Sequence, residues 1–286
     1  MTKKMIIKRA AVILLCLVLV PFFVLYVWSS GIIHKKYKIP LTEIAVPTDS
    51  VEVAEGKRLA SIAHCGGCHG SDFTGRVVVR IKNEFKFVAP NITKIIPEYT
   101  ASELERLLKH GIKKNGESVY FMPCFSFHEL KDESVARIIA YLKTIAPAPS
   151  YPDLPSSIVF YPLGRLHIIQ GKLPHMADII DHDSKDKYVP RDSSQVALGQ
   201  YIAMSTCTSC HGLDLKGEQG FSPDLVIATA YTPDQFMHLI KTGEGGLGRK
   251  KLRLMSETAK NFLSALREEE INAVYAYLRS MHTKQP

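Results

Sequence analysis

The longest apolar stretch of the chain lies close to its start. Residues 10–28 form an apolar run of nineteen residues without a charged side chain. A helix needs about 20 such residues to cross the hydrocarbon core of a bilayer. The run predicts a transmembrane helix over residues 10–30, after a cytoplasmic terminus at residues 1–9. The alternative is a cleaved signal peptide, but its apolar region usually spans about 7 to 15 residues, and no Ala-x-Ala step follows here.

Beyond this run, apolar residues recur at helical spacing. Segments 130–142 and 266–278 place apolar side chains three and four residues apart, which aligns them on one face of a helix. These side chains are Val135, Ile138, Ile139 and Leu142 in the first segment and Ile271, Val274, Tyr275 and Leu278 in the second. Each segment is predicted to close a domain with one face turned to a core.

These helices belong to an internal repeat. The matching stretches are 69–75 with 211–217, 99–111 with 231–243, and 130–142 with 266–278. Two copies of one domain are therefore predicted at residues 50–147 and 191–283, joined by a linker at 148–190.

Local signals mark helix ends in both copies. Thr100 and Thr232 each begin a Thr-x-x-Glu/Gln capping box, and Gly111 and Gly243 lie where the helices should stop. The predicted fold class is all-α, with two tandem helical domains after one N-terminal transmembrane helix.

A glycine lies near the start of the first helix predicted in each copy. These helices cover residues 51–64 and 194–206, and the glycines are Gly56 and Gly199. We expect both glycines to let the first and last helices of a domain cross closely; the alternative is a glycine tolerated at the surface.

Four of the six cysteines form Cys-x-x-Cys pairs followed at once by histidine, in residues 65–69 and 207–211. This is the attachment motif of c-type haem, in which both thiols form thioethers and the histidine binds the iron. The motifs predict two haem c groups, attached at Cys65, Cys68, Cys207 and Cys210, with His69 and His211 as axial ligands. A redox disulfide or half of a zinc site would require a thioredoxin-like strand pattern or further ligands at suitable spacing, and neither is evident.

The second axial ligand determines what such an iron can do. Met122 and Met255 lie in matching loops between predicted helices, and we expect them to complete the two coordination shells. Methionine raises the reduction potential and leaves no open position, which suits electron transfer. The alternatives are His128 for the first haem, and His110 or His238 for either.

A histidine that binds a metal usually donates its other ring N–H to a carbonyl group. Pro90 and Pro223 fall at matching points between motif and capping box, so their carbonyls are the predicted acceptors. Cys124 has no counterpart in the second copy and is interpreted as a small buried apolar residue.

The predicted linker changes character along its length. Its first half is rich in proline, which makes a chain stiff and extended, and residues 160–169 are apolar. We expect the apolar part to pack on a domain and the linker to strap the two domains together.

Charge changes the interpretation little. The net charge is +8, but residues 1–40 hold seven basic residues and no acid, which leaves about +1 for the remainder. The basic character is thus interpreted as membrane flanking, and no nucleic-acid partner is expected.

The motifs resemble those of class I cytochromes c. The resemblance rests on Cys65-x-x-Cys68-His69-Gly70, Met122-Pro123 and the closing segment 139–142, and in the second copy on residues 207–212, Met255 and 275–278. The tandem is similar to the multihaem cytochrome subunits of membrane-bound alcohol and sugar dehydrogenases, and more distantly to the dihaem subunit of some terminal oxidases. Those dehydrogenase subunits commonly hold three haems, whereas this chain has two motifs.

The resulting hypothesis is a dihaem electron carrier rather than an enzyme in its own right. Because c-type haems are attached after export, the haem domains are predicted in the periplasm, on a single-pass inner-membrane protein whose partners are redox proteins or subunits of a membrane complex. The alternatives are a dihaem peroxidase or sulfur-compound oxidoreductase, the electron-accepting subunit of a dehydrogenase or oxidase, and a haem-based sensor.

Overall fold

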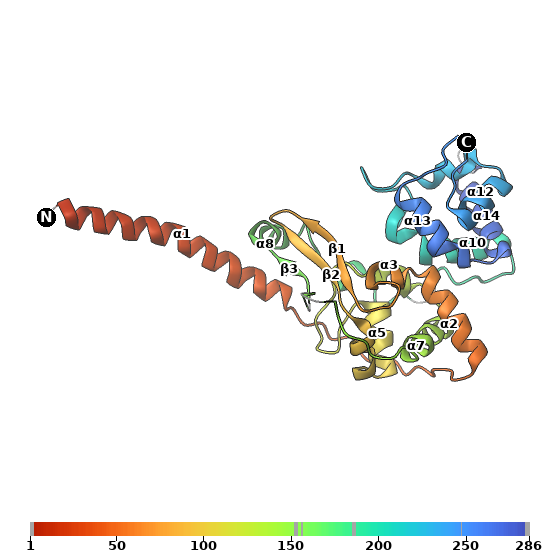
Figure 1. Ribbon diagram of the computed structural model, residues 1–286, viewed down its shortest axis with the longest axis horizontal. Coiled ribbons are helices and arrows are strands. Elements are labelled where there is room, and N and C mark those ends of the chain that lie inside the picture. Colours follow the sequence, from red (N-terminus) through yellow and green to blue (C-terminus); the bar gives the residue numbers. More distant parts are fainter. Residues whose placement is uncertain (1–2, 152–153, 156, 185–186, 247, 284–286) are drawn as a thin grey trace.

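The computed structural model describes residues 3–151, 154–155, 157–184, 187–246 and 248–283. One long helix projects from two groups of shorter helices (Figure 1). Residues 1–2 of the predicted cytoplasmic terminus and residues 152, 153, 156, 185 and 186 of the predicted linker lie outside the described part.

The projecting helix is α1, Lys3–Ile33. It extends beyond the predicted span at both ends, and most of its apolar side chains are exposed. Within the described residues it is the helix whose length and composition are sufficient to cross a membrane.

The first group of helices follows α1. Its elements are α2 (Ser50–Ile62), α3 (Cys65–His69), α4 (Ile92–Ile95), the 3-10 turn η1 (Ile96–Glu98), α5 (Ala101–His110), α6 (Cys124–His128) and α7 (Asp132–Lys143). Its core gathers apolar residues from α2, α5, α6 and α7. Cys124 is fully buried, as predicted.

The second group repeats this arrangement. Its elements are α10 (Gln195–Thr206), α11 (Thr208–His211), η2 (Leu225–Ala230), α12 (Pro233–Thr242), α13 (Leu254–Asn261), η3 (Leu263–Ala265) and α14 (Glu268–Thr283). The predicted capping boxes at Thr100 and Thr232 are confirmed. Gly111 and Gly243 end α5 and α12 in the left-handed conformation, with φ of 68° and 77°.

In both groups the first helix crosses the last at a glycine. A Cβ atom on Gly56 would lie 1.9 Å from the carbonyl oxygen of Arg137 in α7. A Cβ atom on Gly199 would lie 1.9 Å from the carbonyl oxygen of Ala273 in α14. The close crossings predicted from sequence are therefore confirmed, and the same contact recurs in both copies.

The mainly helical class is confirmed, but the first group also contains a small antiparallel sheet that we did not predict. The sheet consists of β1 (Arg76–Ile81), β2 (Phe85–Ala89) and β3 (Val159–Phe160), in that order. The signal was present in the sequence: β-branched residues dominate β1, and Asn83 takes the left-handed conformation in the turn that follows.

The linker folds back onto the first group instead of crossing solvent. After β3 it forms α8 (Pro162–Ile169) and α9 (Met176–Ile179). α8 packs against α1, and the Met176 amide donates to the Val119 carbonyl at 2.9 Å. The prediction that residues 160–169 pack on a domain is confirmed. Tyr188 then packs against the second core, so the linker contacts both groups.

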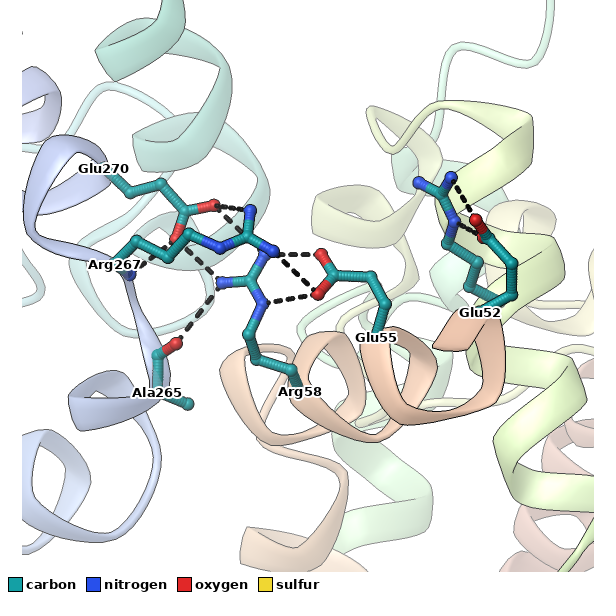
Figure 2. Close-up of polar contacts among 7 residues, drawn as sticks. Glu52, Glu55, Arg58, Ala265, Arg267 and Glu270 are labelled. Carbon is teal, nitrogen blue, oxygen red and sulfur yellow. Dashed lines mark hydrogen bonds and ion pairs between the residues drawn. The ribbon is translucent and has the colours of Figure 1, made fainter. Parts of the chain in front are cut away.

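An ion-pair cluster joins the two groups (Figure 2). The guanidinium of Arg58 in α2 donates to Glu55 at 2.7 Å and to Glu270 of α14 at 2.7 Å. Arg58 also donates to the carbonyl of Ala265 at 3.3 Å, and Arg267 donates to Glu55 at 2.9 Å. Because Arg58 is satisfied from both sides, the cluster fixes α2 against the start of α14.

Candidate haem-binding sites

The first Cys-x-x-Cys-His motif forms the short helix α3. His64 precedes it in the left-handed conformation (φ 58°), and Gly70 ends it with φ of 85°. The Nδ1 atom of His69 lies 2.9 Å from the carbonyl oxygen of Pro90. Since a carbonyl only accepts, Nδ1 carries the proton, and Nε2 keeps a lone pair for a metal.

The second motif repeats this geometry. α10 leads into Cys207, α11 carries the remainder of the motif, and Gly212 ends it with φ of 77°. The Nδ1 atom of His211 lies 2.8 Å from the carbonyl oxygen of Pro223. Both predicted histidine–carbonyl hydrogen bonds are therefore confirmed.

The motif cysteines lie in surroundings that disfavour the thiolate form. All four are free thiols in this structure. Burial raises the pKa of Cys65 and of Cys207 to about 12, so both stay protonated at neutral pH. Reactive Cys-x-x-Cys thiols have lowered pKa values, which generate the nucleophilic thiolate. The surroundings therefore favour a structural role for these sulfurs, as in thioether attachment.

The walls around the motifs suit an apolar macrocycle. Cys65 and Met122 both pack against the first core, and Cys207 and Met255 both pack against the second. Met122 lies in a loop, as predicted, but the prediction of a loop at Met255 is wrong, because Met255 lies in the first turn of α13. Beside Cys65 lies a small apolar cavity, lined by Ala63, Leu108, Phe127, Leu130, Val135 and Ile138. Each apolar core thus carries two cysteine thiols, one histidine whose Nε2 is left free for a metal, and one methionine sulfur. This set of groups fits a covalently bound haem.

The rival histidines are engaged elsewhere. Both ring nitrogens of His128 face backbone carbonyls, those of Lys109 at 3.0 Å and Ser184 at 2.7 Å. His110 bonds the ring of His182 through its Nδ1 at 2.9 Å. His238 is exposed, and its Nε2 lies 3.3 Å from the Glu244 carboxylate. These contacts favour the methionines over the histidines as second ligands.

The two motifs lie next to each other at the boundary between the groups. The Ser126 hydroxyl of α6 bonds the Thr208 hydroxyl inside the second motif, at 2.7 Å, and both side chains are buried. From the other side, the Phe262 ring lies against Gly67 inside the first motif and meets the His64 ring edge-on, with centroids 5.4 Å apart. These contacts could not be predicted from the sequence, because no local pattern pairs residues so far apart.

Core packing and the pKa of Cys68 also indicate that the two motifs lie close together. Ile62 of α2 belongs to the second core, while Tyr201 of α10 packs against the first. Burial raises the pKa of the Cys68 thiol, Arg76 opposes that rise, and the Cys210 thiol adds to it. The two attachment motifs therefore face one continuous interface.

Both helical groups match a known protein family. The family model for cytochrome c matches residues 53–146 and 196–282. The chain belongs to the cytochrome c family. Each matched region contains one Cys-x-x-Cys-His motif, and haem c is the cofactor that such domains imply.

The relatives are cytochrome subunits of dehydrogenases. The chain is 24% identical over 268 residues to the fructose dehydrogenase cytochrome subunit of Gluconobacter japonicus, covering 81% of this chain and 53% of the relative. It is 26% identical over 179 residues to the cytochrome c subunit of alcohol dehydrogenase (quinone) of Gluconacetobacter polyoxogenes, covering 57% and 36%. It is 27% identical over 174 residues to the gluconate 2-dehydrogenase cytochrome c subunit of Pantoea cypripedii, covering 56% and 37%. This cytochrome c chain thus spans about half of the first relative and little more than a third of the others.

Proposed function

We propose that the chain is a dihaem cytochrome c that transfers single electrons at the periplasmic face of the inner membrane, with α1 as its anchor. The attachment residues are Cys65 and Cys68 for one haem and Cys207 and Cys210 for the other; the axial pairs are His69 with Met122 and His211 with Met255. When bound, each haem supplies reversible one-electron exchange at its iron.

The duplicated histidine geometry carries this proposal. His69 and His211 each donate from Nδ1 to a proline carbonyl, at 2.9 and 2.8 Å, which fixes the ring and its tautomer in the same way in both domains. A ligand held so firmly needs little rearrangement when the charge of the metal changes. The adjacency of the motifs shortens the path that an electron follows between the two sites.

The donor or acceptor is proposed to be another subunit of a membrane-bound dehydrogenase. The support is that each relative described above is named as the cytochrome subunit of a dehydrogenase, together with the proposed anchor α1. The chain itself would then accept electrons from a catalytic partner and perform no substrate chemistry.

The competing function is a dihaem peroxidase or sulfur-compound oxidoreductase, in which one iron keeps an open or displaceable position. Near-infrared and EPR spectra of the purified, oxidised full chain separate the two. We expect two low-spin centres with sulfur-to-iron charge-transfer bands, and a mass that exceeds the polypeptide by two haems. A high-spin centre, a single haem, or strong carbon monoxide binding at both reduced irons contradicts the proposal.

Matched variants assign the ligands. Met122→Ala and Met255→Ala should each remove one of the two charge-transfer bands and leave the other unchanged. Met237→Leu is the control, because Met237 packs against the second core on α12 and should leave both bands in place. If Met255→Ala retained both bands, the ligand assignment in the second domain would be wrong.

A further inference from the structure

The short linker helix α8 is held against the last turns of α1. The Arg165 guanidinium lies 3.7 Å from the centre of the Tyr26 ring. It also donates to the Ser29 hydroxyl at 2.8 Å and to the Ser30 hydroxyl at 3.1 Å. Ser29 is completely buried by this packing, although its helix neighbours are largely exposed. The contact therefore fixes α8 at one level along α1.

That level corresponds to the edge of a bilayer. The apolar run, residues 10–28, is about 28 Å long as a helix, close to the roughly 30 Å of a hydrocarbon core. Tyr26 and Trp28 then lie at the outer boundary, where aromatic side chains gather in membrane proteins. A helix is about 10 Å wide, so α8, in contact with residues 26–30, must reach the headgroup region.

The side of α8 that is not packed on protein is apolar. Gly164 lies so close to the hairpin turn that a Cβ atom would be 2.0 Å from the Glu84 carbonyl oxygen, and Ile168 is buried. Leu163 and Leu166 are each 40% exposed, three residues apart and thus on one face. Two exposed leucines on an eight-residue helix beside a membrane anchor are placed to contact lipid.

The tip of the β1–β2 hairpin extends this apolar area. The Leu163 amide donates to the Asn83 carbonyl at 3.2 Å, which joins the tip to α8. Val79 and Ile81 are 42% and 40% exposed on one face of β1. The exposed Arg80 and Lys82 alternate with them and so lie on the opposite face of the hairpin tip, from which long basic side chains can extend to headgroup phosphates. In Figure 1 the hairpin and α8 lie together beside the end of α1.

We propose that α8 and the hairpin tip, residues 79–82, form a membrane-seating surface that rests on the outer leaflet and fixes the orientation of the first domain. The proposal rests on the proposed membrane anchoring by α1. Its occupant is the lipid bilayer, because the surface is continuous with α1 at the depth where the apolar run ends. An apolar helix face with basic flanks is the usual composition of a segment lying in the interface.

Spin-label accessibility in vesicles of phosphatidylcholine and phosphatidylglycerol tests this surface. The full chain carries Cys16→Ala and one label, at Leu166→Cys or Ile81→Cys. Each accessibility is taken relative to the same oxidised sample without reagent, so that relaxation by the haem iron cancels. Ile227→Cys is the matched control, because Ile227 is also an apolar residue, 41% exposed, but belongs to the second domain. Val20→Cys within α1 reports separately on the anchor. Haem content checks that each variant is folded.

We expect an oxygen-to-nickel-complex accessibility ratio at positions 81 and 166 that is several-fold higher than at 227, and higher still at 20. Equal ratios at 81, 166 and 227, with a lipid-like ratio at 20, overturn the membrane-seating surface and leave the anchor intact. Protection of 81 and 166 from both reagents also overturns it, because protein then covers the surface. An aqueous ratio at position 20 refutes the membrane anchoring itself.

Discussion

The paired glycine crossings allow the same perturbation in both domains. Gly56→Ala places a methyl group 1.9 Å from the Arg137 carbonyl oxygen, and Gly199→Ala does the same at the Ala273 carbonyl oxygen. Neither oxygen can rotate away, because each belongs to the backbone of a helix. The two helices must therefore separate or bend, and the core that they close must loosen.

The expected magnitude follows from two opposing effects. Overpacking in a core costs about 1 to 3 kcal/mol, and a clash with backbone belongs at the upper end. Alanine gains about 1 kcal/mol over glycine inside a helix, which offsets part of this cost. Each variant should thus lose about 2 kcal/mol in the free energy of unfolding of its own domain. For a domain of this size, the midpoint temperature should fall by about 8 to 16 °C.

Thermal unfolding of the full chain gives the size of the loss, and hydrogen exchange gives its location. Gly56→Ala should increase exchange in α2 and α7, while Gly199→Ala should increase it in α10 and α14. Gly31→Ala is the control, because Gly31 is a helical glycine with nothing within 4 Å of an added Cβ atom, and this substitution should not lower the midpoint temperature. A loss below about 0.5 kcal/mol for Gly56→Ala, which is the range of ordinary surface substitutions, would refute the crossing as described.

Three further predictions concern polar contacts. A double-mutant cycle with Arg58→Met and Glu270→Gln should give a coupling free energy of about 1 to 2 kcal/mol, because both side chains are mostly buried. The coupling should weaken as salt is added. Zero coupling would show that the pair is only a surface contact. The hydrogen bond from Arg58 lowers the pKa of Glu55 below its ordinary value of 4.5, so its contribution to stability is complete above pH 4.5 and is lost as pH falls toward the lower folded-state pKa. Unfolding measured between pH 3 and 6 should accordingly depend less on pH in Glu55→Gln than in the unmodified protein, and parallel curves would contradict this. Tyr275→Phe removes the 2.5 Å hydrogen bond from the Tyr275 hydroxyl to the Tyr231 carbonyl. Denaturant titration should show that the second domain is destabilised by about 1 kcal/mol. An unchanged midpoint would show that the hydroxyl contributes nothing to stability.

Features encoded by local spacing could be predicted from the sequence. The Thr100 and Thr232 capping boxes depend on two side chains three residues apart, so the pattern alone identifies the helix start. Because the domain occurs twice, each local pattern could be compared with its match in the other copy. Pro90 and Pro223, for example, became candidates because both occupied the same place relative to their histidines.

Contacts between distant residues could not be predicted in this way. Glu55 and Arg58 have the spacing of an ordinary pair on one helix surface, and nothing in the sequence shows that Glu270 joins them. The strand pair of the first domain was missed because the comparison of the two copies gives most weight to what they share. Residues 76–89 are matched in the second copy by only the shorter segment 218–222, so their β-branched pattern received too little weight.

The spacer residues of the two motifs show how the copies have diverged. Covalent attachment makes no demand on the two residues between the cysteines, yet here each spacer accommodates the other half of the molecule. The Phe262 ring lies beside Gly66 and Gly67, whereas Thr208 supplies the hydroxyl that meets Ser126. The two spacers therefore make different contacts with the opposite half of the molecule, at positions that a motif search treats as arbitrary.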